Sequence, residues 1–121
     1  MQRFEPMVAV DVETKQEALR LFDKLSSDTE HQPIVKIGME LYYAFGPGIV
    51  REAKGRGLTV FLDLKLYDIP NTVERTMRVL GALGASFVTT HAAGGTEMMK
   101  AAKRGLLAGA TAVGRRQPRS E

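Results

Sequence analysis

Ionisable side chains accompany all four short apolar runs of the sequence, and their types and spacing can support proton chemistry. Asp11 follows the first run, Lys36 lies within the second, and His91 follows the fourth. The third run leads directly into Asp63 and Lys65. These two residues are two positions apart, so on a strand their side chains point to the same face and should be in contact.

An alternating row of ammonium and carboxylate groups suits the delivery of a proton to carbon. Lys36 would bring a second ammonium beside the pair of Asp63 and Lys65, and Asp68 could extend the row. A carboxylate beside a substrate carboxylate disfavours the bound acid, and this stress is relieved when carbon dioxide leaves; the ammonium then protonates the carbanion. No metal is required, and an ammonium cannot be a metal ligand. A structural salt-bridge network is the alternative explanation of these charges.

The elements that must position these side chains are four repeats of a strand followed by a helix. Strands are expected at residues 7–10, 34–37, 59–62 and 87–90. The expected helices are one opened by a capping box at Thr14 to Glu17, one from Pro47 to Gly57, one from about Asn71 and one from about Thr96 to Leu107. Three of them have an apolar face at helical spacing: Ala18, Leu21, Phe22 and Leu25 on the first, Val73, Met77, Leu80 and Leu83 on the third, and Met98, Ala101, Ala102 and Gly105 on the last. The carboxyl ends of parallel strands converge on the ligand crevice, which is where the charged residues fall.

The spacing of the strand ends predicts the fold class. Counting from Asp11 to Lys36, on to Asp63 and on to His91 gives intervals of 25, 27 and 28 residues. An eightfold βα barrel allots roughly 31 residues to each unit. Residues 1–109 are therefore expected to form an α/β domain with a parallel sheet, the first four βα units of a (β/α)8 or TIM barrel. An open doubly wound sheet would show the same alternation.

The composition excludes several classes of function. A chain of 121 residues with 44% apolar content can bury one modest core, and it has neither an apolar run long enough to span a membrane nor the apolar core of a signal peptide. The absence of cysteine fits a reducing compartment, so a cytoplasmic protein is expected. The net charge of +3 owes much to the basic tail, residues 110–121, and other Lys and Arg are scattered among acids. We therefore expect no nucleic-acid partner.

The run from Phe61 to Thr72 closely resembles the signature of orotidine 5′-monophosphate decarboxylases, an Asp-x-Lys-x-x-Asp-Ile-x-x-Thr segment. Residues 8–11, 35–38 and 90–95 are similar to the first, second and fourth strands of that family. The resemblance covers almost the whole sequence. It implies conversion of orotidine monophosphate to uridine monophosphate in pyrimidine biosynthesis, without a cofactor.

The resemblance also implies a role for each residue of the motif. Lys65 would be the proton donor and Asp63 would lie against the leaving carboxylate. Lys36 and Asp11 would contact the ribose and the charge network, and His91 would help to shape the mouth of the site. A homodimer is implied as well, in which a second copy receives residues offered across the interface: Asp68, Ile69 and Thr72.

The sequence departs from the family at its end. A complete barrel has four further strands, whose loops recognise the pyrimidine and hold the phosphate through a Gln and an Arg, and no residue after Ala110 resembles these. Because remote phosphate binding drives the reaction, its loss should cost affinity and rate. We therefore expect a truncated decarboxylase, weakly active or inactive by itself, with residues 110–121 as a linker cut short.

Two other interpretations stay open. The chain could be a non-catalytic fragment or interaction module. It could also be a magnesium-dependent sugar-phosphate decarboxylase or lyase of the same suprafamily, which shares the Asp-x-Lys-x-x-Asp strand. Those enzymes bind magnesium through an acid at the end of the second strand, where this sequence has Lys36.

Overall fold

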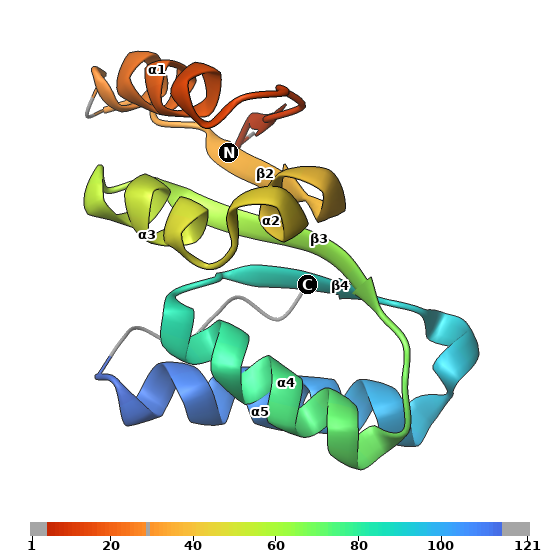
Figure 1. Cartoon of the computed structure of the whole chain (residues 1–121). Coiled ribbons are helices and arrows are strands. Elements are labelled where there is room, and N and C mark those ends of the chain that lie inside the picture. Colours follow the sequence, from red (N-terminus) through yellow and green to blue (C-terminus); the bar gives the residue numbers. More distant parts are fainter. Residues whose placement is uncertain (1–4, 29, 115–121) are drawn as a thin grey trace. The chain divides into compact units, whose positions relative to one another are not determined.

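A computed structural model describes residues 5–28 and 30–114, so the arginines of the predicted basic tail, at positions 115, 116 and 119, lie outside the described residues. Strands and helices alternate along the chain as β1 (Met7–Ala9), α1 (Lys15–Ser26), β2 (Ile34–Gly38), α2 (Met39–Phe45), α3 (Gly48–Gly55), β3 (Thr59–Leu66), α4 (Pro70–Leu83), β4 (Phe87–Thr90), the 3₁₀ turn η1 (Ala92–Gly94) and α5 (Thr96–Ala112) (Figure 1). The strands form an open parallel sheet of order β1-β2-β3-β4. The predicted βα alternation is confirmed.

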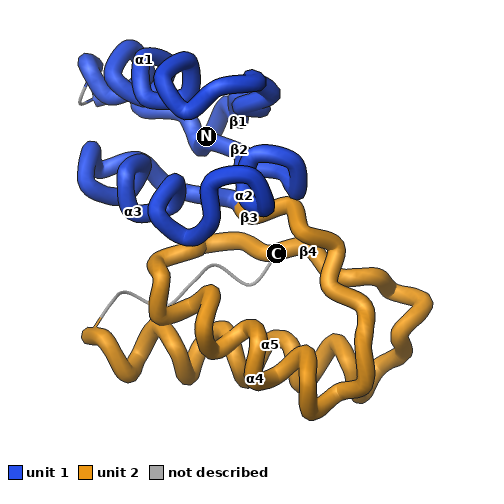
Figure 2. The backbone as a smooth tube through the Cα atoms, in the orientation of Figure 1, with its two compact units in different colours: residues 1–61 blue, residues 62–121 orange. Residues whose placement is uncertain are grey.

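The chain divides into two compact units, residues 1–61 and 62–121, with the boundary inside β3 (Figure 2). In the first unit β1 pairs in parallel with β2, so that Ala9 lies opposite Lys36. The backbone N–H of Val10 continues the ladder with a 2.9 Å hydrogen bond to the carbonyl of Lys36. The C-terminal ends of these two strands therefore lie side by side, as the alternation predicted.

Helix α1 begins where the capping pattern predicted. The Thr14 hydroxyl accepts a 3.1 Å hydrogen bond from the N–H of Glu17, which satisfies one of the free donors of the first turn. Ala18 and Phe22 on its apolar face are fully buried. The cap and the apolar face together place the helix in the expected register.

The helix predicted from Pro47 to Gly57 is present as α3, with Pro47 as its N-cap, but the short helix α2 before it was not predicted. Helix α2 starts directly after β2, and its N-cap residue, Gly38, has no side chain that could make a capping hydrogen bond. Gly46, with φ of 71°, ends α2, and α3 then ends at Gly55. The missed helix thus lacks the capping signal on which the prediction depended.

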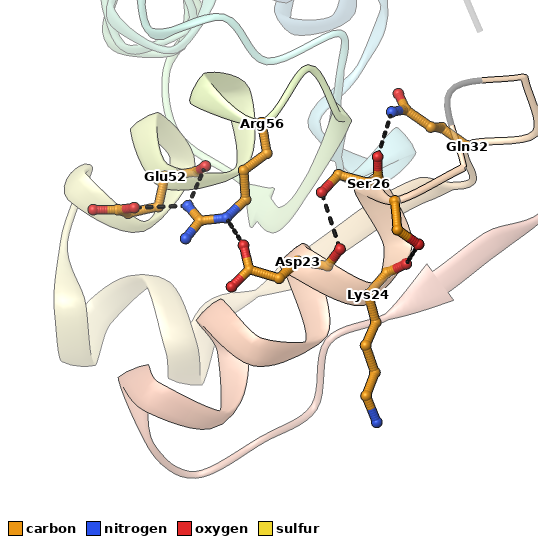
Figure 3. A network of polar contacts seen from close by, with 7 residues as sticks. Asp23, Lys24, Ser26, Gln32, Glu52 and Arg56 are labelled. Carbon is orange, nitrogen blue, oxygen red and sulfur yellow. Dashed lines mark hydrogen bonds and ion pairs between the residues drawn. The ribbon is translucent and has the colours of Figure 1, made fainter.

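A cluster of charged side chains joins α1 to α3 in the first unit (Figure 3). The Arg56 guanidinium donates a 2.6 Å hydrogen bond to Asp23 from Nε. Its Nη1 also donates to the carboxylate of Glu52, at 2.8 Å, and to the Glu52 carbonyl, at 2.9 Å. The hydrogen bond to Asp23, followed by that to Glu52, raises the pKa of Arg56.

The second unit is organised by close packing of α4 against α5, which lie side by side in Figure 1. The predicted apolar faces are confirmed, because all of their members are buried: Val73, Met77, Leu80 and Leu83 on α4, and Met98, Ala101, Ala102 and Gly105 on α5. A Cβ on Gly81, Gly105 or Gly109 would overlap a backbone carbonyl of the facing helix. The two helix backbones therefore touch. Helix α5 runs to Ala112, beyond the predicted end.

Membrane insertion was not expected from the composition. Within the described part of the chain, no helix is both long enough and apolar enough to cross a bilayer.

Candidate functional site

Strand β3 carries the charged pair on one of its two faces. Val60, Leu62 and Leu64 alternate on the buried face, which leaves Asp63 and Lys65 on the opposite, more open face. Lys65 Nζ lies 2.9 Å from Asp63 Oδ1. The Asp63 side chain is 17% exposed and that of Lys65 is 49% exposed. The predicted contact between the two residues is confirmed, and the carboxylate is less exposed to solvent than the ammonium.

The backbone of Lys65 is held in an unusual conformation. Its φ of 52° lies in the left-handed region, and it is the one residue other than glycine with a positive φ in residues 5–28 and 30–114. Left-handed backbone brings Cβ close to the following carbonyl and costs about 1–3 kcal/mol. Such strain persists only where neighbouring contacts impose it, and it concentrates at functional sites.

Thr89 on β4 contacts both members of the pair. Its hydroxyl donates a 2.8 Å hydrogen bond to Asp63 Oδ1 and accepts another, also 2.8 Å, from the backbone N–H of Lys65. A hydroxyl has one proton to give and lone pairs to receive, so one group can make both contacts. The sequence analysis missed Thr89. Alternation along β4 puts it on the face of His91, two residues further, but a threonine in a strand is ordinary and gives no chemical signal of a role in the site.

His91 lies beside Tyr67 at the ends of β3 and β4. Its N–H donates a 3.2 Å hydrogen bond to the carbonyl of Leu66, which continues the pairing of the two strands. The rings of His91 and Tyr67 meet edge to face, with centroids 5.3 Å apart and planes at 87°. Tyr67 was not among the predicted site residues. Both rings are exposed to solvent, and they lie at the same strand ends that carry Lys65 and Thr89.

The three residues that the resemblance assigns to a second copy, Asp68, Ile69 and Thr72, all lie in the turn and first helical turn after β3 and are exposed. Asp68 Oδ1 accepts a 2.7 Å hydrogen bond from the N–H of Ile69, just before α4 begins. Within the described residues no hydrogen bond or ion pair joins Asp68 to Lys65. The Ile69 side chain is 65% exposed.

Asp11 and Lys36 belong to the first unit. Lys36 is half-buried on β2, opposite Ala9, and Asp11 is exposed two residues after the end of β1. They therefore lie at the C-terminal ends of neighbouring parallel strands. Their convergence with Asp63 and Lys65 remains a prediction. Within residues 5–28 and 30–114, no three His, Asp or Glu side chains gather closely enough to hold a metal ion.

Comparison with known proteins identifies the family of this chain. The family model described as "Orotidine 5'-phosphate decarboxylase / HUMPS family" matches residues 5–114. The chain belongs to this family. The orotidine 5′-phosphate decarboxylase of Lactiplantibacillus plantarum is 54% identical over 113 residues, which are 93% of this chain and 47% of that protein. That of Lactococcus lactis subsp. cremoris MG1363 is 50% identical over 98% of this chain and 49% of its own length.

Solved structures agree with this assignment. An uncharacterized conserved protein of Geobacillus kaustophilus matches with a TM-score of 0.82 at 51% identity, over 93% of this chain and 51% of that chain. The decarboxylase of Lactobacillus acidophilus matches with a TM-score of 0.78 at 41% identity, over 87% and 46%. The predicted fold class, four βα units of a TIM barrel, is confirmed, and the chain spans about half the length of the curated relatives it matches.

Proposed function

We propose that this chain carries the proton-delivery part of an orotidine 5′-phosphate decarboxylase, which converts orotidine 5′-phosphate to uridine 5′-phosphate and carbon dioxide in pyrimidine biosynthesis, in the cytoplasm. The observation that supports it most is the 2.9 Å ion pair of Lys65 with the mostly buried carboxylate of Asp63. Both residues lie in the segment that carries the family signature. Relatives that are 54% and 50% identical to the chain over the matched residues bear the name of this enzyme.

The pair explains how the reaction proceeds without metal or cofactor. Asp63 faces the carboxylate of the bound substrate, and repulsion between the two anions disfavours the ground state. When the bond from the ring carbon to the carboxylate breaks, its electron pair stays on that carbon and neutral carbon dioxide leaves. The Lys65 ammonium stabilises the carbanion, gives it a proton and becomes a neutral amine. Solvent returns the proton to Lys65.

The remaining residues of the site have supporting roles in this proposal. Lys36 and Asp11 contact the ribose and extend the row of charges. His91 shapes the mouth of the site. The functional assembly is a homodimer in which the exposed turn after β3 reaches the second copy's substrate: Asp68, Ile69 and Thr72.

Turnover in this proposal depends on the region of the relatives that the chain does not match, more than half of the L. plantarum enzyme. Binding energy from the phosphate, remote from the reacting carbon, is needed to offset the repulsion that Asp63 creates. We therefore expect the chain by itself to be weakly active or inactive, and to become active when groups that hold the phosphate are supplied.

The test is a decarboxylation assay of the purified chain, alone and mixed with the part of the L. plantarum enzyme that the match leaves uncovered. Loss of orotidine 5′-phosphate and release of carbon dioxide are measured with wild type, with Lys65→Ala and with a matched control, Lys103→Ala, which removes an exposed lysine of α5.

The mixture of wild type and the uncovered part should decarboxylate, and Lys103→Ala should match it. Lys65→Ala should abolish turnover, with a loss of at least about 100-fold, the lower end for a positioned general acid. Retained turnover with Lys65→Ala would mean that the proton comes from another group. A wild-type chain without turnover in either preparation would favour the interpretation as a non-catalytic module.

A further inference from the structure

The hydroxyl of Thr89 forms hydrogen bonds to both residues that the proposed chemistry uses, Asp63 and Lys65. Thr89 Oγ1 donates a hydrogen bond to Asp63 Oδ1 and accepts one from the backbone N–H of Lys65, each at 2.8 Å. We propose that Thr89 is the positioning residue of this site, which holds the backbone of Lys65 and the carboxylate of Asp63 in the one arrangement that presents the ammonium to the substrate. The catalytic consequence of this inference rests on the proposed decarboxylation, whereas the geometric part does not.

The backbone of Lys65 shows why a positioning residue is needed. A lysine with φ of 52° tends to relax to an ordinary strand conformation, because left-handed backbone is unfavourable for every residue with a Cβ. The hydrogen bond from its N–H to Thr89 is made to a side chain on the neighbouring strand, 24 positions further along the chain. This bond fixes the direction of the N–H and opposes the rotation that would relieve the strain.

The carboxylate of Asp63 is held from two directions. Oδ1 accepts both the Thr89 hydroxyl, at 2.8 Å, and the Lys65 ammonium, at 2.9 Å. The threonine thus fixes the rotation of the carboxylate, and the carboxylate fixes the end of the lysine side chain. Because a general acid must lie within hydrogen-bond reach of the atom it protonates, a small displacement of this chain of contacts would lower the rate.

The sequence offers a matched control on the same strand. Thr90 is the next residue of β4, of the same type and also half-buried, and alternation turns its side chain to the other face. No hydrogen bond of the Thr90 hydroxyl is present in the described part of the chain. Thr90→Val therefore tests the loss of a hydroxyl from β4 without loss of the contacts to Asp63 and Lys65.

The first experiment measures amide hydrogen exchange by NMR on the purified full chain, and it needs no enzymatic activity. In Thr89→Val the Lys65 amide should exchange about tenfold faster or more, as loss of one ordinary hydrogen bond predicts. Thr89→Ser, which keeps the hydroxyl, should exchange as wild type does, and so should Thr90→Val. Amides of Val73 and Met77 in α4 serve as the internal reference. Unchanged exchange of Lys65 in Thr89→Val would overturn the assignment of Thr89.

The second experiment measures kcat and KM in the decarboxylating mixture described above. Thr89→Val should lower kcat about tenfold or more with KM within about twofold of wild type, because the ammonium is misplaced while substrate binding is kept. Thr89→Ser should restore kcat, and Thr90→Val should leave it unchanged. A Thr89→Val variant with wild-type kcat would overturn the catalytic consequence. Absence of turnover in the wild-type mixture would count against the proposed function alone, because the exchange of Lys65 still decides the role of Thr89.

Discussion

Two contacts within the second unit are built in opposite ways. Where α4 meets α5, three glycines let the helix backbones touch, and apolar side chains fill the rest of the contact. Where β3 meets β4, one residue is strained, and a carboxylate, an ammonium and a hydroxyl are joined by short hydrogen bonds. The first contact stabilises the fold, whereas the second keeps strain and charge where stability alone would favour neither. This difference separates the parts of the unit that fold it from the part that is proposed to act.

The largest expected effect is on activity at the strand end. Lys65→Gly removes the ammonium and at the same time relieves the left-handed strain, because glycine adopts a positive φ without penalty. The decarboxylation rate of the mixture should fall at least about 100-fold. The free energy of unfolding should exceed that of Lys65→Ala by about 1 kcal/mol, the cost of left-handed backbone for a residue with a Cβ. Assays and urea unfolding of both variants check this, and a glycine variant less stable than the alanine variant would contradict the strain.

The helix contact should show a large effect on stability instead. Gly109→Ala places a methyl group against the backbone carbonyl of Arg78, so the helices must separate. We expect the free energy of unfolding to fall by about 1–3 kcal/mol, although alanine is intrinsically the better helix former. Gly55→Ala is the matched control, because no atom lies within 4 Å of the added methyl group there. Equal unfolding midpoints for the two variants would show that α4 and α5 are not in backbone contact.

A smaller effect is expected at the charged cluster of the first unit. Arg56→Ala removes the hydrogen bond to Asp23 that joins α3 to α1 and the hydrogen bond to Glu52 within α3. Because these carboxylates are largely exposed, the stability lost should be about 1 kcal/mol or less. Arg56→Lys, which keeps the charge and loses the planar fork, should recover only part of it. Denaturant unfolding of the three proteins measures this, and a loss comparable to that of Gly109→Ala would contradict the ranking of polar and backbone contacts.

The smallest effect concerns pH. The backbone N–H of Glu30, and after it that of His31, lower the pKa of the exposed carboxyl of Asp28. A lowered pKa in the folded chain means that the carboxylate stabilises the fold above pH 3.8, and that this contribution is lost as pH falls through the lowered value. Wild type should therefore be slightly more stable than Asp28→Asn at pH 7, and the difference should shrink below pH 3.8. Unfolding curves at both pH values test this, with a pH-independent difference as the contrary result.

The sequence predicted the parts of the structure that depend on local pattern. The cap at Thr14, the apolar faces of α4 and α5 and the contact of Asp63 with Lys65 all follow from helix or strand periodicity. Helix α2 was missed because its first turn follows β2 without a capping side chain. The positive φ of Lys65 was missed because its N–H is bound to a side chain 24 positions away, and no local sequence pattern indicates such a contact.

The role of Thr89 shows the same limit within the candidate site. Threonine in a strand is ordinary, and its importance comes from the register that sets its hydroxyl between the Lys65 N–H and the Asp63 carboxylate. Ionisable residues at strand ends could be selected from the sequence by their chemistry, whereas a neutral positioning group could not. The pair was therefore predicted, and its support was found only in the structure.

We propose that Lys36 joins Asp63 and Lys65 at one mouth, so that two ammonium groups and a carboxylate surround the reacting carbon. A crystal structure of the wild-type chain tests this directly. We predict that Lys36 Nζ lies within about 4 Å of the Asp63 carboxylate, the distance of an ion pair. A crystal structure with Lys36 and Asp63 on opposite faces of the sheet would contradict it.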